Sequence, residues 1–130
     1  MVNFTFAAVL ALSATVLADK FHFQVKPTSG AAVFLKADGS AVSSAAEAAT
    51  CTIDAGYLSC DGKGGPTFTG DMTEMKLVAG KGSKGWTETG GKIGWNGKNF
   101  SIRKGTSKIW AESCPHGHFP DHGTATAVPA

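Results

Sequence analysis

The sequence predicts a small single-domain all-β protein, a sandwich or barrel-like fold built from repeated β-hairpins. The first observation is a ten-residue pattern that occurs twice without a gap, at 51–60 and at 86–95. Each copy has a bulky residue at both ends, small turn residues in its middle, and Asp-Gly or Asn-Gly directly after it. The second observation is a count of 17 glycines without a collagen-like period, which is typical of many tight turns between short strands.

The repeated pattern also predicts the register of the two hairpins. Two-residue turns at Ala55-Gly56 and at Gly90-Gly91 would set the first residue of each copy opposite the last. Because side chains alternate along a strand, each hairpin would present one apolar face. The residues on these faces are Cys51, Ile53, Leu58 and Cys60 in the first hairpin, and Trp86, Glu88, Ile93 and Trp95 in the second.

The remaining elements follow from alternation and from turn residues. Residues 21–26 alternate apolar and polar side chains, which predicts a half-buried strand. Residues 43–49 favour helix but are too short for a stable one, so one helical turn or an ordered loop is expected. The other predicted strands are 32–36, 67–69, 73–79, with Met75, Leu77 and Ala79 on its apolar side, and the last pair 100–102 and 107–110, which places Trp110 inward with the other tryptophans.

Residues 1–18 have the features of a secretory signal peptide. Val2–Ala18 carries no charge, contains a short apolar run and ends in small residues suited to cleavage. This run is too short to span a bilayer comfortably. We therefore expect a secreted, extracellular chain with a β-rich domain at 19–113, a His-rich flexible tail at 114–130, and no membrane association after signal removal.

The sequence indicates neither nucleic acid nor a dinucleotide as a ligand. A net charge of +2 spread along the chain does not indicate nucleic acid. Residues 80–85 spell G-x-G-x-x-G, but a hairpin follows where a dinucleotide site needs a helix. We expect a basic, glycine-rich loop there.

The three cysteines indicate at least one disulfide in an oxidising compartment. The hairpin register favours Cys51 with Cys60, because directly opposed residues can be bridged. Alternatively, Cys114 pairs with one of them and closes a loop of more than fifty residues. An unpaired Cys114 would permit a disulfide-linked dimer.

The densest set of metal-binding atoms lies at the start of the predicted tail. Cys114, His116, His118 and His122 carry a thiol and imidazoles that could bind copper or zinc. Their spacing matches no established structural zinc pattern, and the alternative is a solvated polar extension. No other cofactor is expected.

Few residues suggest a ligand site elsewhere. Glu88, placed among aromatic residues, could act as a general acid or line a sugar-binding groove, or it could reach solvent at the hairpin edge and pair with a neighbour. Tyr57, with Lys81 and Lys84, could contact polysaccharide or a host protein. Asn99-Phe-Ser101 is an acceptor pattern for N-linked sugar.

Several of these motifs resemble small secreted fungal cell-wall proteins. The run Asp54–Gly62, followed by Gly85-Trp86 and Gly91–Trp95, is similar to the phialide-type (PhiA-like) wall proteins and to the C-terminal domain of yeast wall proteins with internal repeats. In both groups a short glycine turn precedes a Gly-Trp hairpin. The opening strand near Phe21 is also similar to the start of the phialide-type proteins.

The resemblance implies a secreted, non-enzymatic structural protein of a fungal cell wall or surface. Its expected partners are wall polysaccharide or wall proteins. One alternative is a secreted effector or binding module that contacts carbohydrate or a host protein. A second is an extracellular metal-binding protein that uses the C-terminal His/Cys cluster.

Overall fold

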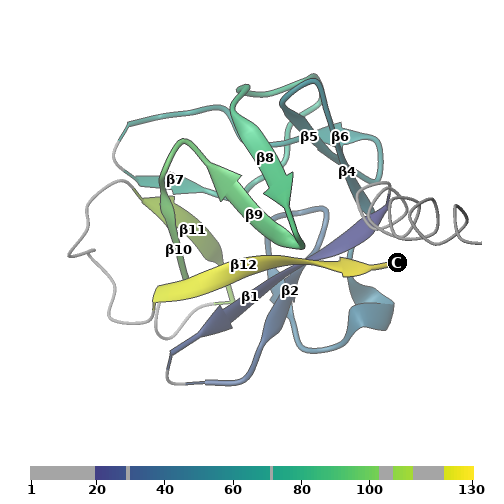
Figure 1. Cartoon of the computed structure of the whole chain (residues 1–130), viewed down its shortest axis with the longest axis vertical. Coiled ribbons are helices and arrows are strands. Elements are labelled where there is room, and N and C mark those ends of the chain that lie inside the picture. The colour runs from purple at the N-terminus through teal and green to yellow at the C-terminus, as the bar shows by residue number, and fades with distance from the viewer. Residues whose placement is uncertain (1–19, 29, 71, 103–106, 113–121) are drawn as a thin grey trace, which may run out of the picture.

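The computed structural model describes residues 20–28, 30–70, 72–102, 107–112 and 122–130. These residues form one curled, antiparallel, 12-stranded sheet with a barrel-like shape, which confirms the predicted all-β class (Figure 1). The strands are β1 (Phe21–Pro27), β2 (Val33–Leu35), β3 (Ala41–Val42), β4 (Cys51–Asp54), β5 (Tyr57–Cys60), β6 (Lys63–Gly64), β7 (Met72–Glu74), β8 (Trp86–Thr89), β9 (Lys92–Trp95), β10 (Asn99–Ile102), β11 (Ile109–Glu112) and β12 (His122–Pro129).

The sheet is organised around the antiparallel pair β1 and β12. These two strands are in register from Phe21, opposite Pro129, to Pro27, opposite Gly123. The main strand order is β6-β5-β4-β1-β12-β10-β11-β7, while β2 pairs with β1 and β3, and β9 pairs with β12 and β8. The two strands lie side by side across the molecule, so the first and the last strand of the described chain are neighbours in the sheet (Figure 1).

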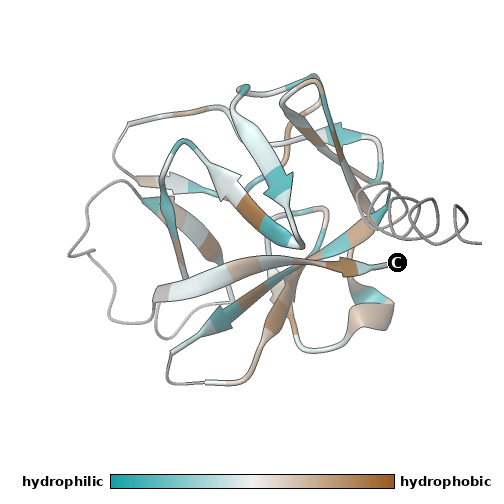
Figure 2. Cartoon of the chain, viewed as in Figure 1, coloured by the Kyte–Doolittle hydropathy of each residue, from teal (hydrophilic) through white to brown (hydrophobic). Residues whose placement is uncertain are grey.

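The predicted alternation of β1 is confirmed. Phe21, Phe23 and Val25 are fully buried, while His22 and Gln24 between them are half-buried and Lys26 is exposed. Figure 2 shows the same change between hydrophobic and hydrophilic residues along this part of the sheet.

The prediction of a flexible tail is wrong for residues 122–130, and the β-domain does not end at 113. Strand β12 is formed by alternating small residues, with Ala125 and Ala127 buried and Thr124 exposed. Alanine has too little apolar surface to mark a strand in the sequence, but a small side chain fits a central strand that is paired on both sides. Residues 114–121 lie outside the described residues.

Both hairpins have the predicted register. Cys51 lies opposite Cys60, and Trp86 lies opposite Trp95. The turns between them, Ala55-Gly56 and Gly90-Gly91, have positive φ at both positions: 52° and 85° in the first, 60° and 88° in the second. This conformation is the type I′ turn, whose twist matches that of paired strands.

The dipeptide after each copy of the pattern forms another turn of the same kind. Asp61-Gly62 has φ values of 49° and 81°, and Asn96-Gly97 has values of 50° and 72°. The first turn leads into β6, where Lys63 pairs with Cys60. The second is closed by the Lys98 N–H, which donates to the Trp95 carbonyl oxygen at 3.0 Å. The sequence repeat is thus a repeated hairpin followed by a repeated tight turn.

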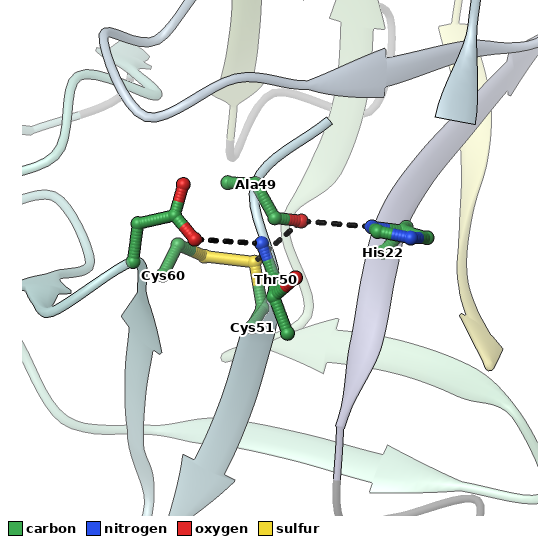
Figure 3. Close-up of a disulfide and its surroundings, with 6 residues drawn as sticks. His22, Ala49, Thr50, Cys51 and Cys60 are labelled. Atoms are coloured by element: carbon green, nitrogen blue, oxygen red, sulfur yellow. Dashed lines mark hydrogen bonds between the residues drawn. A yellow bond between two sulfur atoms is a disulfide. The ribbon is translucent and has the colours of Figure 1, made fainter. Parts of the chain in front are cut away.

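A disulfide closes the end of the first hairpin, between Cys51 and Cys60 (Figure 3). The favoured pairing is confirmed, and the alternative in which Cys114 pairs with either residue is wrong. The surroundings tie this end to the sheet: the Thr50 N–H donates to Asp61 Oδ1 at 3.0 Å, and His22 Nδ1 donates to the Ala49 carbonyl oxygen at 3.0 Å (Figure 3). Both sulfur atoms belong to fully buried residues.

At the matching end of the second hairpin, two stacked tryptophans replace the disulfide. The rings of Trp86 and Trp95 are parallel within 7°, with centroids 4.5 Å apart. Phe23 packs edge-on against Trp86 at 5.8 Å and against Phe100 at 5.5 Å. All four rings belong to the hydrophobic core. The inward placement predicted for Trp110 is only partly right, because that side chain is half-buried.

Two of the predicted strands are absent or shorter in the structure, and the predicted helical turn is present. Residues 67–69 form no strand, so that prediction is wrong. The predicted strand 73–79 is shortened to β7, because the Lys76 N–H donates to the Glu74 carbonyl oxygen at 2.7 Å and turns the chain out of the sheet. Met75 and Leu77 are nevertheless buried, whereas Ala79 is exposed. Residues 45–47 form the expected single helical turn, of the 3-10 type.

We predict that removal of the disulfide lowers the free energy of unfolding by about 2–3 kcal/mol, the loop entropy expected for a closure of about ten residues. The comparison is between Cys51→Ala/Cys60→Ala and its parent, both carrying Cys114→Ser to prevent exchange, in chemical denaturation. The reduced parent should show a similar loss. Equal stability of the oxidised parent and the double variant would contradict this role.

Candidate binding site

The outer face of the first hairpin carries polar side chains. Thr52 pairs with Ser59, and Asp54 pairs with Tyr57, on the face opposite the buried cysteines. These four residues line a cavity of about 310 Å³. Because β4 and β5 are joined by a two-residue turn and stapled by the disulfide, the four side chains are held on a rigid element.

The start of the glycine-rich loop 80–85 also lines this cavity. Gly80 and Lys81 line it directly. The Lys81 Nζ lies 5.2 Å from the centroid of the Tyr57 ring, and the Lys84 Nζ lies 5.8 Å from it, both over the ring. The structure therefore brings together three of the four residues proposed from sequence as ligand contacts, from two separate parts of the chain.

The glycines of this loop allow its close approach to the neighbouring chain. Gly82 has a φ of +70°, and a Cβ atom there would collide with the Gly65 carbonyl oxygen. Gly85 has a φ of +110°, and a Cβ atom there would lie 2.6 Å from the Asn96 side chain. The motif that resembles a dinucleotide signature thus serves backbone packing in a loop, as expected.

Hydrogen bonds fix the same loop along its length. The Ser83 N–H donates to the Pro66 carbonyl oxygen at 3.2 Å, and the Trp95 indole Nε1 donates to the Lys84 carbonyl oxygen at 3.1 Å. The N–H groups of Gly85 and Trp86 both donate to the Gly56 carbonyl oxygen at 3.0 Å. The turn of the first hairpin, whose outer face lines the cavity, is therefore bonded to the start of the second hairpin.

Packing also guides the side chain of Lys84. A Cβ atom added at Gly56 would lie only 3.0 Å from Lys84 Cγ and 3.2 Å from Lys84 Cε. The aliphatic part of Lys84 therefore runs over the glycine of the first turn, toward the Tyr57 ring. An ammonium group above an aromatic ring is attracted by the ring quadrupole.

Glu88, the fourth proposed contact, does not line this cavity. It is half-buried opposite Ile93, and its Oε2 accepts a hydrogen bond of 2.6 Å from the Gly91 N–H. The carboxylate therefore stabilises the turn of its own hairpin, which agrees with the alternative of a neighbour contact at the hairpin edge.

The proposed metal ligands lie almost wholly outside the described residues. This applies to Cys114, His116 and His118, while His122 is described only as the first backbone position of β12. Within the described residues, no group of three or more His, Cys, Asp or Glu side chains gathers as a metal site would require. Asn99, the glycosylation candidate, begins β10 and is half-buried.

Sequence reasoning missed the hydroxyl and carboxylate groups of the cavity, on Thr52, Ser59 and Asp54. The signal was available, because positions 52, 54, 57 and 59 alternate with the apolar positions of the predicted hairpin. It also missed a second, more apolar cavity of about 370 Å³ beside the half-buried Trp110. Pro66, Thr67 and Thr69 line that cavity, and the sequence assigned residues 67–69 to a strand.

No protein family, curated protein or solved structure shows significant similarity to this chain. The resemblance to fungal wall proteins therefore stays a prediction from the sequence. Within the part of the chain that the structure describes, no helix has the length and apolar character needed to cross a membrane.

We predict that Gly82→Ala destabilises the protein by about 2 kcal/mol or more, because the new Cβ is opposed by both the positive φ and the Gly65 carbonyl. Gly80→Ala is the matched control: nothing lies within 4 Å of its added Cβ, so its effect should stay within about 0.5 kcal/mol. Thermal or denaturant unfolding measures both. Equal effects would show that the loop does not need its close packing.

Proposed function

We propose that this chain is a secreted, non-enzymatic protein of a fungal cell wall or surface, and that it holds wall polysaccharide in the cavity beside Tyr57. The apolar N-terminal segment, the wall-protein resemblance and the buried disulfide support an extracellular location. Attachment through a binding cavity would let a small domain contribute to the wall without a covalent link.

The observation that carries this proposal is the composition of the cavity on a rigid frame. The cavity is lined by one aromatic ring, two hydroxyl groups and one carboxylate from the first hairpin and by Lys81 from loop 80–85. The ammonium group of Lys84, from the same loop, lies over the same ring. Ligand sites combine apolar contact surface with a few fixed polar groups. A sugar polymer, which has apolar ring faces and many hydroxyl groups, matches this combination.

The role of Glu88 favours binding over catalysis. It was the carboxylate that the sequence offered as a general acid, but it is engaged in a short hydrogen bond to its own turn. Asp54 and Tyr57 instead face the cavity as hydrogen-bonding groups on neighbouring positions of the hairpin.

We predict that the mature protein is retained by isolated cell-wall material of the producing organism, and that Tyr57→Ala weakens retention by about tenfold, because it removes the central ring. Co-sedimentation with washed wall fractions measures both. Phe68→Ala is the matched control, since Phe68 is 48% exposed and does not line the cavity.

The control should keep the retention of the parent protein. If the natural protein is found only in culture fluid, and the purified protein does not sediment with wall material, the proposed function is wrong. If Phe68→Ala reduces retention as strongly as Tyr57→Ala, the cavity is not the site of contact.

A further inference from the structure

We infer that the Tyr57 cavity selects an acidic polysaccharide, one whose sugar units carry carboxylate groups, through the ammonium groups of Lys81 and Lys84. This inference rests on the proposed function, because it names the class of polymer that the same cavity would hold. Three observations support this inference. Two ammonium groups lie at the Tyr57 ring, they cover a ring face on which a sugar could stack, and loop 80–85, which carries them, is already ordered.

Two positive charges meet at one aromatic ring, and neither forms an ion pair with a described carboxylate. The ammonium groups of Lys81 and Lys84 lie 5.2 and 5.8 Å from the centroid of the Tyr57 ring. Among the described residues, no carboxylate lies within 4.0 Å of either ammonium group. Cation–π attraction offsets part of the cost of bringing the two charges together. A bound anion would offset the rest, so the pair favours a negatively charged ligand.

The position of the cations also discriminates between neutral and acidic sugars. A neutral sugar that stacks on the ring face under an ammonium group must displace that group and lose its cation–π contact. A sugar carboxylate can instead bind at the ammonium groups and leave these contacts in place. The geometry therefore favours the acidic polymer over the neutral one.

The lysines are presented by a loop that is already ordered. Loop 80–85 is held by the hydrogen bonds of Ser83, Lys84 and Gly85 and by close glycine contacts, and the Lys84 stem packs on Gly56. A ligand therefore has less conformational entropy to remove when it binds. Thr52 and Ser59, which line the same cavity, supply hydroxyl groups for the neutral part of the sugar.

Replacement of Asp54 should strengthen the binding of an acidic polymer, whereas replacement of the lysines should weaken it. Its carboxylate lines the cavity and lies opposite Tyr57 in the hairpin, so it repels a bound anion. Asp54→Asn should therefore strengthen the binding of an acidic polymer, whereas it should leave the binding of a neutral polymer unchanged or weaker.

The deciding experiment compares two probes, polygalacturonate and an uncharged β-glucan, with the purified mature protein in titration calorimetry. The parent should bind polygalacturonate more tightly, and Lys81→Gln/Lys84→Gln should weaken this binding by about tenfold. Higher ionic strength should weaken it as well, because exposed charges are screened. The charge-matched control is Lys26→Gln/Lys36→Gln. Both lysines are exposed, and neither lines the cavity. Lys26 also lies near the end of β1 that is farther from β4. It should bind like the parent.

Three outcomes would overturn the inference: equal or tighter binding of the neutral glucan, an equal loss in the control variant, or no binding of polygalacturonate. The first outcome, with binding still abolished by Tyr57→Ala, leaves the proposed function standing and removes only the acidic selectivity. Absence of binding to either polymer and to wall material removes both. Tighter binding by Asp54→Asn supports the inference separately.

Discussion

The stacked pair Trp86 and Trp95 is the interaction on which the rest of the structure depends. It joins the two ends of the second hairpin, and Phe23 of the central strand β1 and Phe100 of β10 pack around it. The same buried pair is bonded to loop 80–85, because Trp95 Nε1 donates to the carbonyl oxygen of Lys84. The core and the candidate site are therefore stabilised by one set of aromatic contacts, and a change in the stacking would move the loop that carries the lysines.

The open ends of the two hairpins are held together by different interactions. Both use a type I′ turn and oppose two residues at the far end, but one pair is a disulfide and the other an aromatic stack. The covalent link holds the hairpin that lines the cavity, and the stack buries the larger apolar surface. The Gly56 carbonyl then accepts two hydrogen bonds, from the N–H groups of Gly85 and Trp86, which fix how the first hairpin meets the start of the second.

Local rules explain how much of this could be predicted from the sequence. The hairpin register followed from the turn residues, since a two-residue turn leaves one pairing, and the alternation of β1 followed from its large apolar side chains. Strand β12 was missed because its buried residues are alanines, whose burial depends on the neighbouring strands. Residues 67–69 were assigned to a strand on a local pattern that tertiary packing overrides. Tyr57, Lys81 and Lys84 were named together from sequence as ligand contacts, but only the folded loop shows that both ammonium groups lie over the Tyr57 ring and that Tyr57 and Lys81 line one cavity.

The most direct test of the account is to locate the bound polymer on the molecule. Amide chemical shifts of the isotope-labelled mature protein would be followed during titration with a short oligogalacturonate. The account predicts changes concentrated in residues 52–59 and 80–86, the two segments that meet at the Gly56 carbonyl. Changes centred instead on β7 and Trp110, beside the second cavity, would contradict it.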